Sequence, residues 1–180
     1  MPRKRLDWII LTAVVVLIGS AWVGMTRVKA SALDTAGKPA RAALGYPAPD
    51  FTLYSPSGSK VTLSSFHGKP IVVNFWATWC PPCRGETPYF VTASKQWQDE
   101  VTIVGVDVRE TPDMAPPFMS EFGIKYPIAL DVDGEVADVY HIVSFPTTYF
   151  VDSKGTITQI DTGPLDAALL QTRLADLAGR

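Results

Sequence analysis

A nearly continuous apolar run, Ile71–Trp76, stands shortly before two cysteines that are separated by a pair of prolines, Cys80-Pro81-Pro82-Cys83. Such a run is typical of a strand that is buried on both faces in the middle of a sheet. Proline is well tolerated in the first turn of a helix, where a missing N–H costs little. The segment therefore predicts a central strand that leads through a short loop into a helix, with both cysteines at the helix start.

The rest of the chain continues this alternation of strands and helices. Leu165 begins a stripe of leucines at helical spacing that ends at Leu177, and Asp152-Ser153-Lys154-Gly155 is a hairpin turn signal. The expected strands cover residues 51–53, 61–63, 71–76, 101–108, 127–130, 147–151 and 156–160, and the expected helices cover about 82–97, 117–122, 135–140 and 165–177. The pattern predicts an α/β domain with a mixed central sheet flanked by helices and with an N-terminal β-hairpin extension.

The N-terminal region has the features of a membrane anchor. A basic cluster, Arg3-Lys4-Arg5, precedes an apolar run from Trp8 to Met25. As a helix this run spans about 27 Å, close to the roughly 30 Å hydrocarbon core of a bilayer, and flanking basic residues stay in the cytoplasm. We expect a cytoplasmic N-terminus over residues 1–7, a single transmembrane helix over 8–25, a linker over 26–45 and one domain over 46–180 on the extracytoplasmic side of the cell membrane.

A cleaved signal peptide is the alternative reading of the same segment. Ala30-Ser31-Ala32 has the small-residue pattern of a cleavage site. However, the apolar run is long for a signal peptide, and Arg27 and Lys29 lie between it and that site. Both interpretations place the domain in the same compartment, so the choice between them does not affect its chemistry.

The cysteine count and the charge exclude other classes of protein. The chain of 180 residues has two cysteines only, and a bridge between neighbours this close stabilises a fold very little. Its formal net charge is −2, from 16 basic and 18 acidic residues, which does not suggest a nucleic-acid partner. The pair is therefore expected to be chemically active rather than structural.

The position of the cysteines at a helix start predicts a redox dithiol. The unpaired N–H groups there favour an anion, so the pKa of the Cys80 thiol is expected to fall below its ordinary value. Cys80, at the exposed edge, would attack a substrate disulfide, and the more shielded Cys83 would resolve the mixed disulfide. Trp79, Pro81 and Pro82 would surround the site and contact the substrate. This chemistry requires no cofactor beyond the Cys80–Cys83 disulfide and no metal.

A second candidate feature is Phe145-Pro146, directly before the expected strand at residues 147–151. Proline is disfavoured inside a central strand, but a cis X–Pro turn at its start is a known exception. Such a turn could present the backbone groups of Ser144 and Phe145 to an extended substrate chain.

These segments together resemble the thioredoxin superfamily over about residues 46–177. The run Asn74–Cys83 looks like the family's active-site strand and loop, Pro88 falls where its helix is kinked, and Phe145-Pro146-Thr147 matches its cis-proline loop. Residues 47–51 resemble the opening of the AhpC/TSA-redoxin branch. Glu86, Pro88, residues 118–119 and residues 149–152 point to membrane-anchored extracytoplasmic reductases of the ResA/TlpA kind.

The resemblance implies a thioredoxin-like fold and a protein-disulfide reductase. Its client would be a disulfide-containing protein such as apocytochrome c before haem attachment, and its electron donor a membrane protein of the CcdA/DsbD type. It also implies that Glu86 lies beside the cysteines and assists proton transfer, since helical spacing places Glu86 one turn after Cys83. One departure is Asn74, where ordinary thioredoxins have a buried Asp, so any carboxylate must come from elsewhere.

Three other functions use similar residues. Zinc needs four ligands, and the further candidates His67 and His141 lack ligand spacing relative to the cysteines. A thiol peroxidase of the AhpC/TSA type would use one peroxide-attacking cysteine, typically with a threonine three residues before it, where this chain has Ala77. A copper metallochaperone would need another soft ligand. The direction of the redox reaction stays open at this stage.

Overall fold

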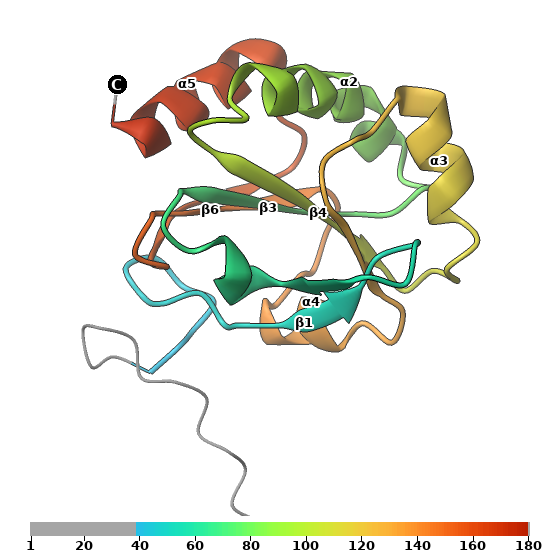
Figure 1. The fold of residues 1–180 in the computed structure, drawn as a ribbon, viewed down its shortest axis with the longest axis horizontal. Coiled ribbons are helices and arrows are strands. Elements are labelled where there is room, and N and C mark those ends of the chain that lie inside the picture. The colour runs from blue at the N-terminus through green and yellow to red at the C-terminus, as the bar shows by residue number, and fades with distance from the viewer. Residues whose placement is uncertain (1–38, 180) are drawn as a thin grey trace, which may run out of the picture. The chain divides into compact units, whose positions relative to one another are not determined.

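Residues 39–179 are described by the computed structural model, and they form a seven-stranded sheet with helices on both faces (Figure 1). The strands are β1 (Thr52–Tyr54), β2 (Lys60–Thr62), β3 (Ile71–Trp76), β4 (Thr102–Val108), β5 (Ile128–Asp131), β6 (Thr147–Val151) and β7 (Ile157–Thr162). Their order across the sheet is β2-β1-β5-β4-β3-β6-β7. Strands β3, β4 and β5 are parallel, whereas β1, β6 and β7 join by antiparallel pairing.

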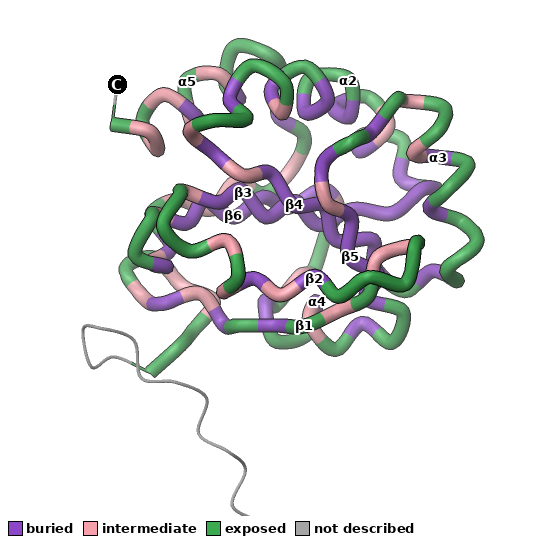
Figure 2. Tube along the Cα trace, viewed as in Figure 1, coloured by how far each residue is buried: buried purple, intermediate pink, exposed green. Residues whose placement is uncertain are grey.

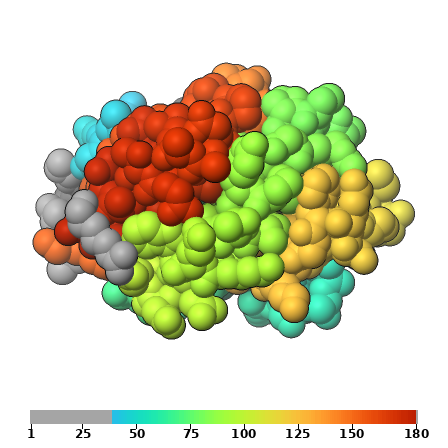
Figure 3. Space-filling view, turned by 90° about the horizontal axis from the view of Figure 1, so that it is seen from above, coloured from blue at the N-terminus to red at the C-terminus, as the bar shows by residue number. Residues whose placement is uncertain are grey.

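Helices cover the sheet in two layers. The helices are η1 (Leu63–Phe66, a 3-10 turn), α2 (Pro81–Gln96), α3 (Ala115–Phe122), α4 (Glu135–Val139) and α5 (Ala167–Ala178). Seen from above, α2, α3 and α5 lie on one face, and α4 lies on the other face in the side view (Figures 1 and 3). This arrangement is the mixed α/β architecture that the alternating pattern predicts, and it is the thioredoxin-like fold that the resemblance implies.

The core is divided by the sheet into two apolar clusters, because side chains of a strand alternate between its faces. Val72, Trp76, Phe90 and Leu170 belong to the cluster beneath α2 and α5, and Phe75 belongs to the cluster on the other side. The central strands are buried along their whole length (Figure 2). Burial on both faces explains why β3 is nearly all apolar in sequence.

The register places the start of β6 beside the end of β3. Phe75 pairs with Thr147 and Asn74 pairs with Thr148 in this antiparallel contact. The Phe145-Pro146 turn, which precedes β6, therefore comes next to the loop that follows β3. The loop over 77–80 and the turn at 145–146 thus meet at the same end of two neighbouring strands in the interior of the sheet.

The observed elements confirm the expected α/β domain, its β1–β2 hairpin and the terminal β6–β7 hairpin, with boundaries that differ by no more than two residues. Within residues 39–179, no helix has both the length and the apolar character needed to cross a membrane. The predicted transmembrane helix over 8–25 and most of the predicted linker lie outside the described residues.

Candidate active site

The two cysteines occupy the start of α2, as the sequence predicts. Cys80 is the N-cap residue and its Sγ accepts a hydrogen bond from the N–H of Cys83 over 3.2 Å. Pro81 and Pro82 fill the first two helical positions and have no N–H, so Cys83 supplies the first backbone donor of the helix. The two sulfurs form a disulfide, with the Cα atoms 5.3 Å apart.

The expected exposure of Cys80 is only partly correct. Cys80 is 3% exposed and Cys83 is 1% exposed, so both are buried in the disulfide form. Both cysteines belong to the apolar cluster beneath α2 and α5. Cys80 nevertheless lines a surface groove of about 380 Å³, which is bordered by Trp79, both prolines and residues 142–145, whereas Cys83 does not. Cys80 is therefore still the more accessible of the two cysteines from solvent.

The Phe145–Pro146 peptide bond is cis, which confirms the predicted turn. Trp79 is 65% exposed and meets the ring of Phe145 edge to face, with ring centroids 5.9 Å apart. An exposed tryptophan that packs on a half-buried phenylalanine at the rim of a groove provides an apolar surface on which a polypeptide can dock.

Glu86 is buried one turn after Cys83 on α2, with 2% of its surface exposed. Its Oε1 accepts a hydrogen bond from Nδ2 of Asn74 and its Oε2 accepts one from the N–H of Leu165, each over 2.9 Å. The Asn74 amide also donates to Oγ1 of Thr148 over 3.0 Å. The alternative interpretation of Glu86, as a solvent-exposed charge in the first turns of the helix, is therefore wrong.

Burial changes the proton affinity of this carboxyl. It raises the pKa of Glu86 from its ordinary 4.5 to about 7, against the hydrogen bonds from Leu165 and Asn74, which favour the ionised form. A carboxyl with a pKa near neutrality can both accept and release a proton at physiological pH. Asn74 holds this group in place from the position where ordinary thioredoxins carry the acid itself.

The sequence profile of the AhpC/TSA family matches residues 44–160, which is more than half of the chain and includes the dithiol, Glu86 and the cis-proline turn. The chain belongs to the AhpC/TSA family.

Its relatives in this family include thiol-disulfide oxidoreductases. The chain is 39% identical over 140 residues to the thiol-disulfide oxidoreductase ResA of Oceanobacillus iheyensis, covering 75% of this chain and 73% of that protein. It is 35% identical over 127 residues to ResA of Bacillus subtilis, covering 70% and 71%. The solved structure of a thiol:disulfide interchange protein of the thioredoxin family from Chlorobium tepidum matches with a TM-score of 0.70 and 31% identity, over 76% of this chain and 99% of that one.

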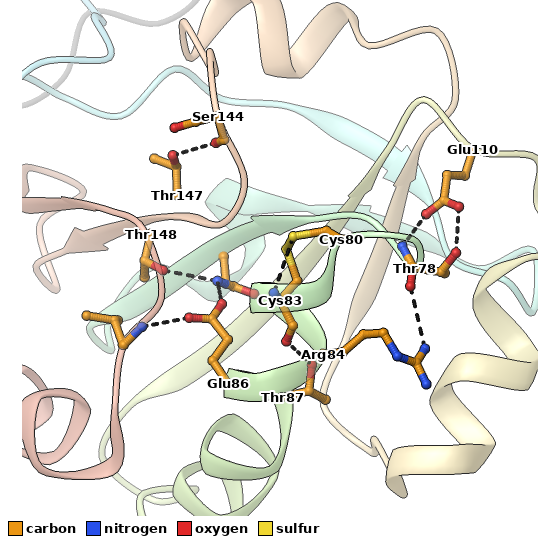
Figure 4. The surroundings of a disulfide bond; sticks show 12 residues. Thr78, Cys80, Cys83, Arg84, Glu86, Thr87, Glu110, Ser144, Thr147 and Thr148 are labelled. Carbon is orange, nitrogen blue, oxygen red and sulfur yellow. Dashed lines mark hydrogen bonds between the residues drawn. A yellow bond between two sulfur atoms is a disulfide. The ribbon is translucent and has the colours of Figure 1, made fainter.

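This AhpC/TSA family member has a second buried carboxylate next to the dithiol, which the sequence analysis missed. Glu110 accepts hydrogen bonds from both the N–H and the Oγ1 of Thr78, two residues before Cys80. Figure 4 shows Glu110 with Thr78 on one side of the disulfide and Glu86 with Thr148 on the other. Glu110 therefore fixes the loop that carries Trp79 and Cys80 into the helix.

Asp107 is a third buried carboxyl and lies on β4, where it pairs with Trp76 of β3. Within residues 39–179, neither carboxyl oxygen of Asp107 has a hydrogen-bond partner. The Nε1 atom of Trp76 has none either. Burial raises the pKa of Asp107 to about 8, and the neighbouring carboxyl of Glu110 adds to that rise. The two carboxyls can share a hydrogen bond only when one of them is protonated. The sequence feature that could have indicated a buried carboxyl was a single acidic residue, Asp107, within an otherwise apolar strand.

The histidines considered as zinc ligands are not grouped with the cysteines as a possible metal site within residues 39–179. His67 packs against Gly155 in the turn between β6 and β7, and His141 lies in the exposed turn after α4. Over the described part of the chain, no three or more His, Cys, Asp or Glu side chains are grouped so that they could hold a metal ion.

Proposed function

We propose that this thiol-disulfide oxidoreductase works as a reductant of protein disulfides on the outer side of a membrane. The observation that carries the proposal is the placement of Cys80. This residue lines the groove between the α2 start and the cis-proline turn, while Cys83 and the proton-accepting Glu86 lie one and two turns further along the same helix and do not line it.

The reaction uses both thiols in turn. The Cys80 thiolate attacks one sulfur of the client disulfide, which forms a mixed disulfide and releases the other client sulfur as a thiolate. The Cys83 thiolate then attacks Sγ of Cys80, which releases the second client sulfur and leaves the Cys80–Cys83 disulfide. Two electrons pass to the client, and its two thiolates take up the two protons that the dithiol loses.

Glu86 supports the second step as a proton acceptor. Cys83 must lose its proton before it can attack, and its helix brings the Glu86 side chain to the same face one turn away. The pKa of Glu86, raised to about 7 by burial, makes the group able to take that proton and to return it in the next cycle. Because Glu86 is held by Asn74 and Leu165, it keeps its position throughout.

The groove provides the client-binding surface. Trp79, Pro81 and Pro82 supply apolar contacts on the α2 side, and Phe145 supplies them on the other side. The cis turn at Pro146 leaves Phe145 directly before β6, where its backbone can pair with an extended client segment.

The membrane location and the identities of the partners belong to the same proposal. The basic cluster before the apolar run 8–25 supports a single-pass anchor with a cytoplasmic N-terminus and a linker over 26–45. Similarity to ResA proteins supports apocytochrome c as the client and a membrane thiol donor of the CcdA/DsbD type as the source of electrons.

The experiment compares the wild-type protein with Cys80→Ser and Cys83→Ser on a protein disulfide substrate, with hydrogen peroxide as a second substrate. Cys80→Ser should abolish reduction, and Cys83→Ser should accumulate a covalent client adduct that a reducing gel step removes. Full turnover by Cys83→Ser would show that the assigned roles are wrong. Faster consumption of peroxide than of disulfide by the wild type would favour the peroxidase.

A further inference from the structure

The groove beside Cys80 contains one charged side chain. Arg109, the residue after β4, lines it together with Cys80, and the other lining residues are apolar or serine. Arg109 is exposed over 53% of its side chain. If the groove distinguishes clients by their charge, that selectivity therefore depends on Arg109.

The backbone at Arg109 adopts a conformation that side chains disfavour. Its φ is 57°, in the left-handed region, and its N–H donates to the carbonyl of Asp131 over 2.9 Å. Within residues 39–179 the other non-glycine residue in this region is His141, with a φ of 54°, directly before the groove residue Ile142. Unfavourable backbone that clusters around one surface is typical of a functional site.

Two neighbours hold the Arg109 side chain in place. It runs across Gly134 so closely that a Cβ there would lie 2.3 Å from Nε of Arg109. At its end, Nη2 pairs with Oδ1 of Asp138 over 2.5 Å. The Asp138 side chain is 69% exposed but does not line the groove, so Arg109 is the member of the pair that belongs to the groove.

The geometry points to Arg109 as a specificity residue that selects client segments with a carboxylate close to the reacting disulfide. This inference rests on the proposed reductase function and adds the chemistry of its client. A guanidinium has five N–H donors and binds a carboxylate through two of them, so a client aspartate or glutamate can bind beside the Asp138 contact. The apolar rings of Trp79 and Phe145 hold the neighbouring part of the client chain.

The test uses full-length protein and three peptides that each contain one intramolecular disulfide and differ only in the residue after the second cysteine, which is Glu, Gln or Lys. The wild type should reduce the Glu peptide with the highest kcat/KM, the Gln peptide with a lower value and the Lys peptide with the lowest. The highest and lowest values should differ roughly tenfold at low salt. This difference should shrink at 0.5 M salt, because salt screens exposed charges. Arg109→Gly should bring the three rates to about the same value. Arg109→Lys should keep the order, and Asp138→Asn should widen the span by removing the competing carboxylate.

Two controls separate this inference from a structural role and from the proposed function. Lys95→Gln removes an exposed charge on α2 away from the groove and should leave the order and the span unchanged. Arg109→Gly should not lower the thermal unfolding midpoint, because glycine suits a positive φ. Equal rates for the three peptides with active wild-type protein would overturn the role of Arg109 alone. Failure of the wild type to reduce hydroxyethyl disulfide, which is small and uncharged, would overturn the reductase itself.

Discussion

The side-chain amide of Asn74 donates one hydrogen bond to Glu86 and another to Thr148, over 2.9 and 3.0 Å. This single amide connects the active-site helix to the strand that follows the cis-proline turn. Asn74 lies on β3 and gives the buried carboxyl of Glu86 a hydrogen-bond donor, and it adds no second acid at this position. The arrangement determines the orientation of the Glu86 carboxyl one turn after Cys83.

Replacement of Glu86 by Gln should slow the resolution of mixed disulfides by about a hundredfold or more, the lower end of the range for a lost general base. In the wild type the rate of this step should rise as the pH passes about 7, where Glu86 loses its proton. Glu86→Gln should lose that rise, since glutamine cannot accept a proton. Stopped-flow rates between pH 5 and 9 measure this, with the exposed Glu135→Gln as a control. An unchanged pH profile would assign Glu86 a structural role.

Replacement of Asn74 by Asp should destabilise the protein in a pH-dependent way. At pH 8 an ionised Asp cannot donate to Glu86, and two like charges then share a buried site, so we expect a loss of about 1–3 kcal/mol in the free energy of unfolding. At pH 5 a protonated Asp still donates, and the loss should be smaller. Urea unfolding at both pH values tests this. Thr148→Val removes the other acceptor without adding charge, and its cost should be similar at both pH values.

Asp107 should make the protein less stable as the pH rises. Its pKa in the folded state is raised from 3.8 to about 8, so between these values the folded protein holds a proton that the unfolded chain has released. The free energy of unfolding therefore falls as the pH rises from about 4 to about 8. Asp107→Asn should flatten this decline, while the exposed Asp133→Asn should not. Parallel curves for Asp107→Asn and the wild type would contradict the buried, protonated state of Asp107.

The N-terminal segment should attach the protein to membranes. Full-length protein should stay with the membrane fraction after an alkaline wash, because an apolar run the length of 8–25 does not leave a bilayer at high pH. A truncated chain that begins near Leu44 should be in the supernatant. Recovery of a native fragment that begins at Leu33 would instead support the cleaved-signal interpretation.

Local patterns in the sequence were sufficient to predict the fold and the dithiol. A buried strand, two prolines at a helix start and a period of leucines are each determined by a few neighbouring residues, and these patterns correctly predicted β3, α2 and α5. The cis bond before Pro146 was predicted with the help of the family resemblance. The anchor was a prediction from local sequence and lies outside the described residues.

Only the tertiary structure decided how the carboxylates are used. Glu110 and Asp107 lie more than 20 residues from the cysteines, and their roles depend on the register between β3 and β4 and on the path of the loop at Thr78. The burial of Cys80, the contact of Glu86 with Leu165 and the position of Arg109 over Gly134 likewise arise from segments far apart in the chain. Proton affinity and access depend on which groups surround a side chain in space, and a single sequence does not specify those long-range neighbours.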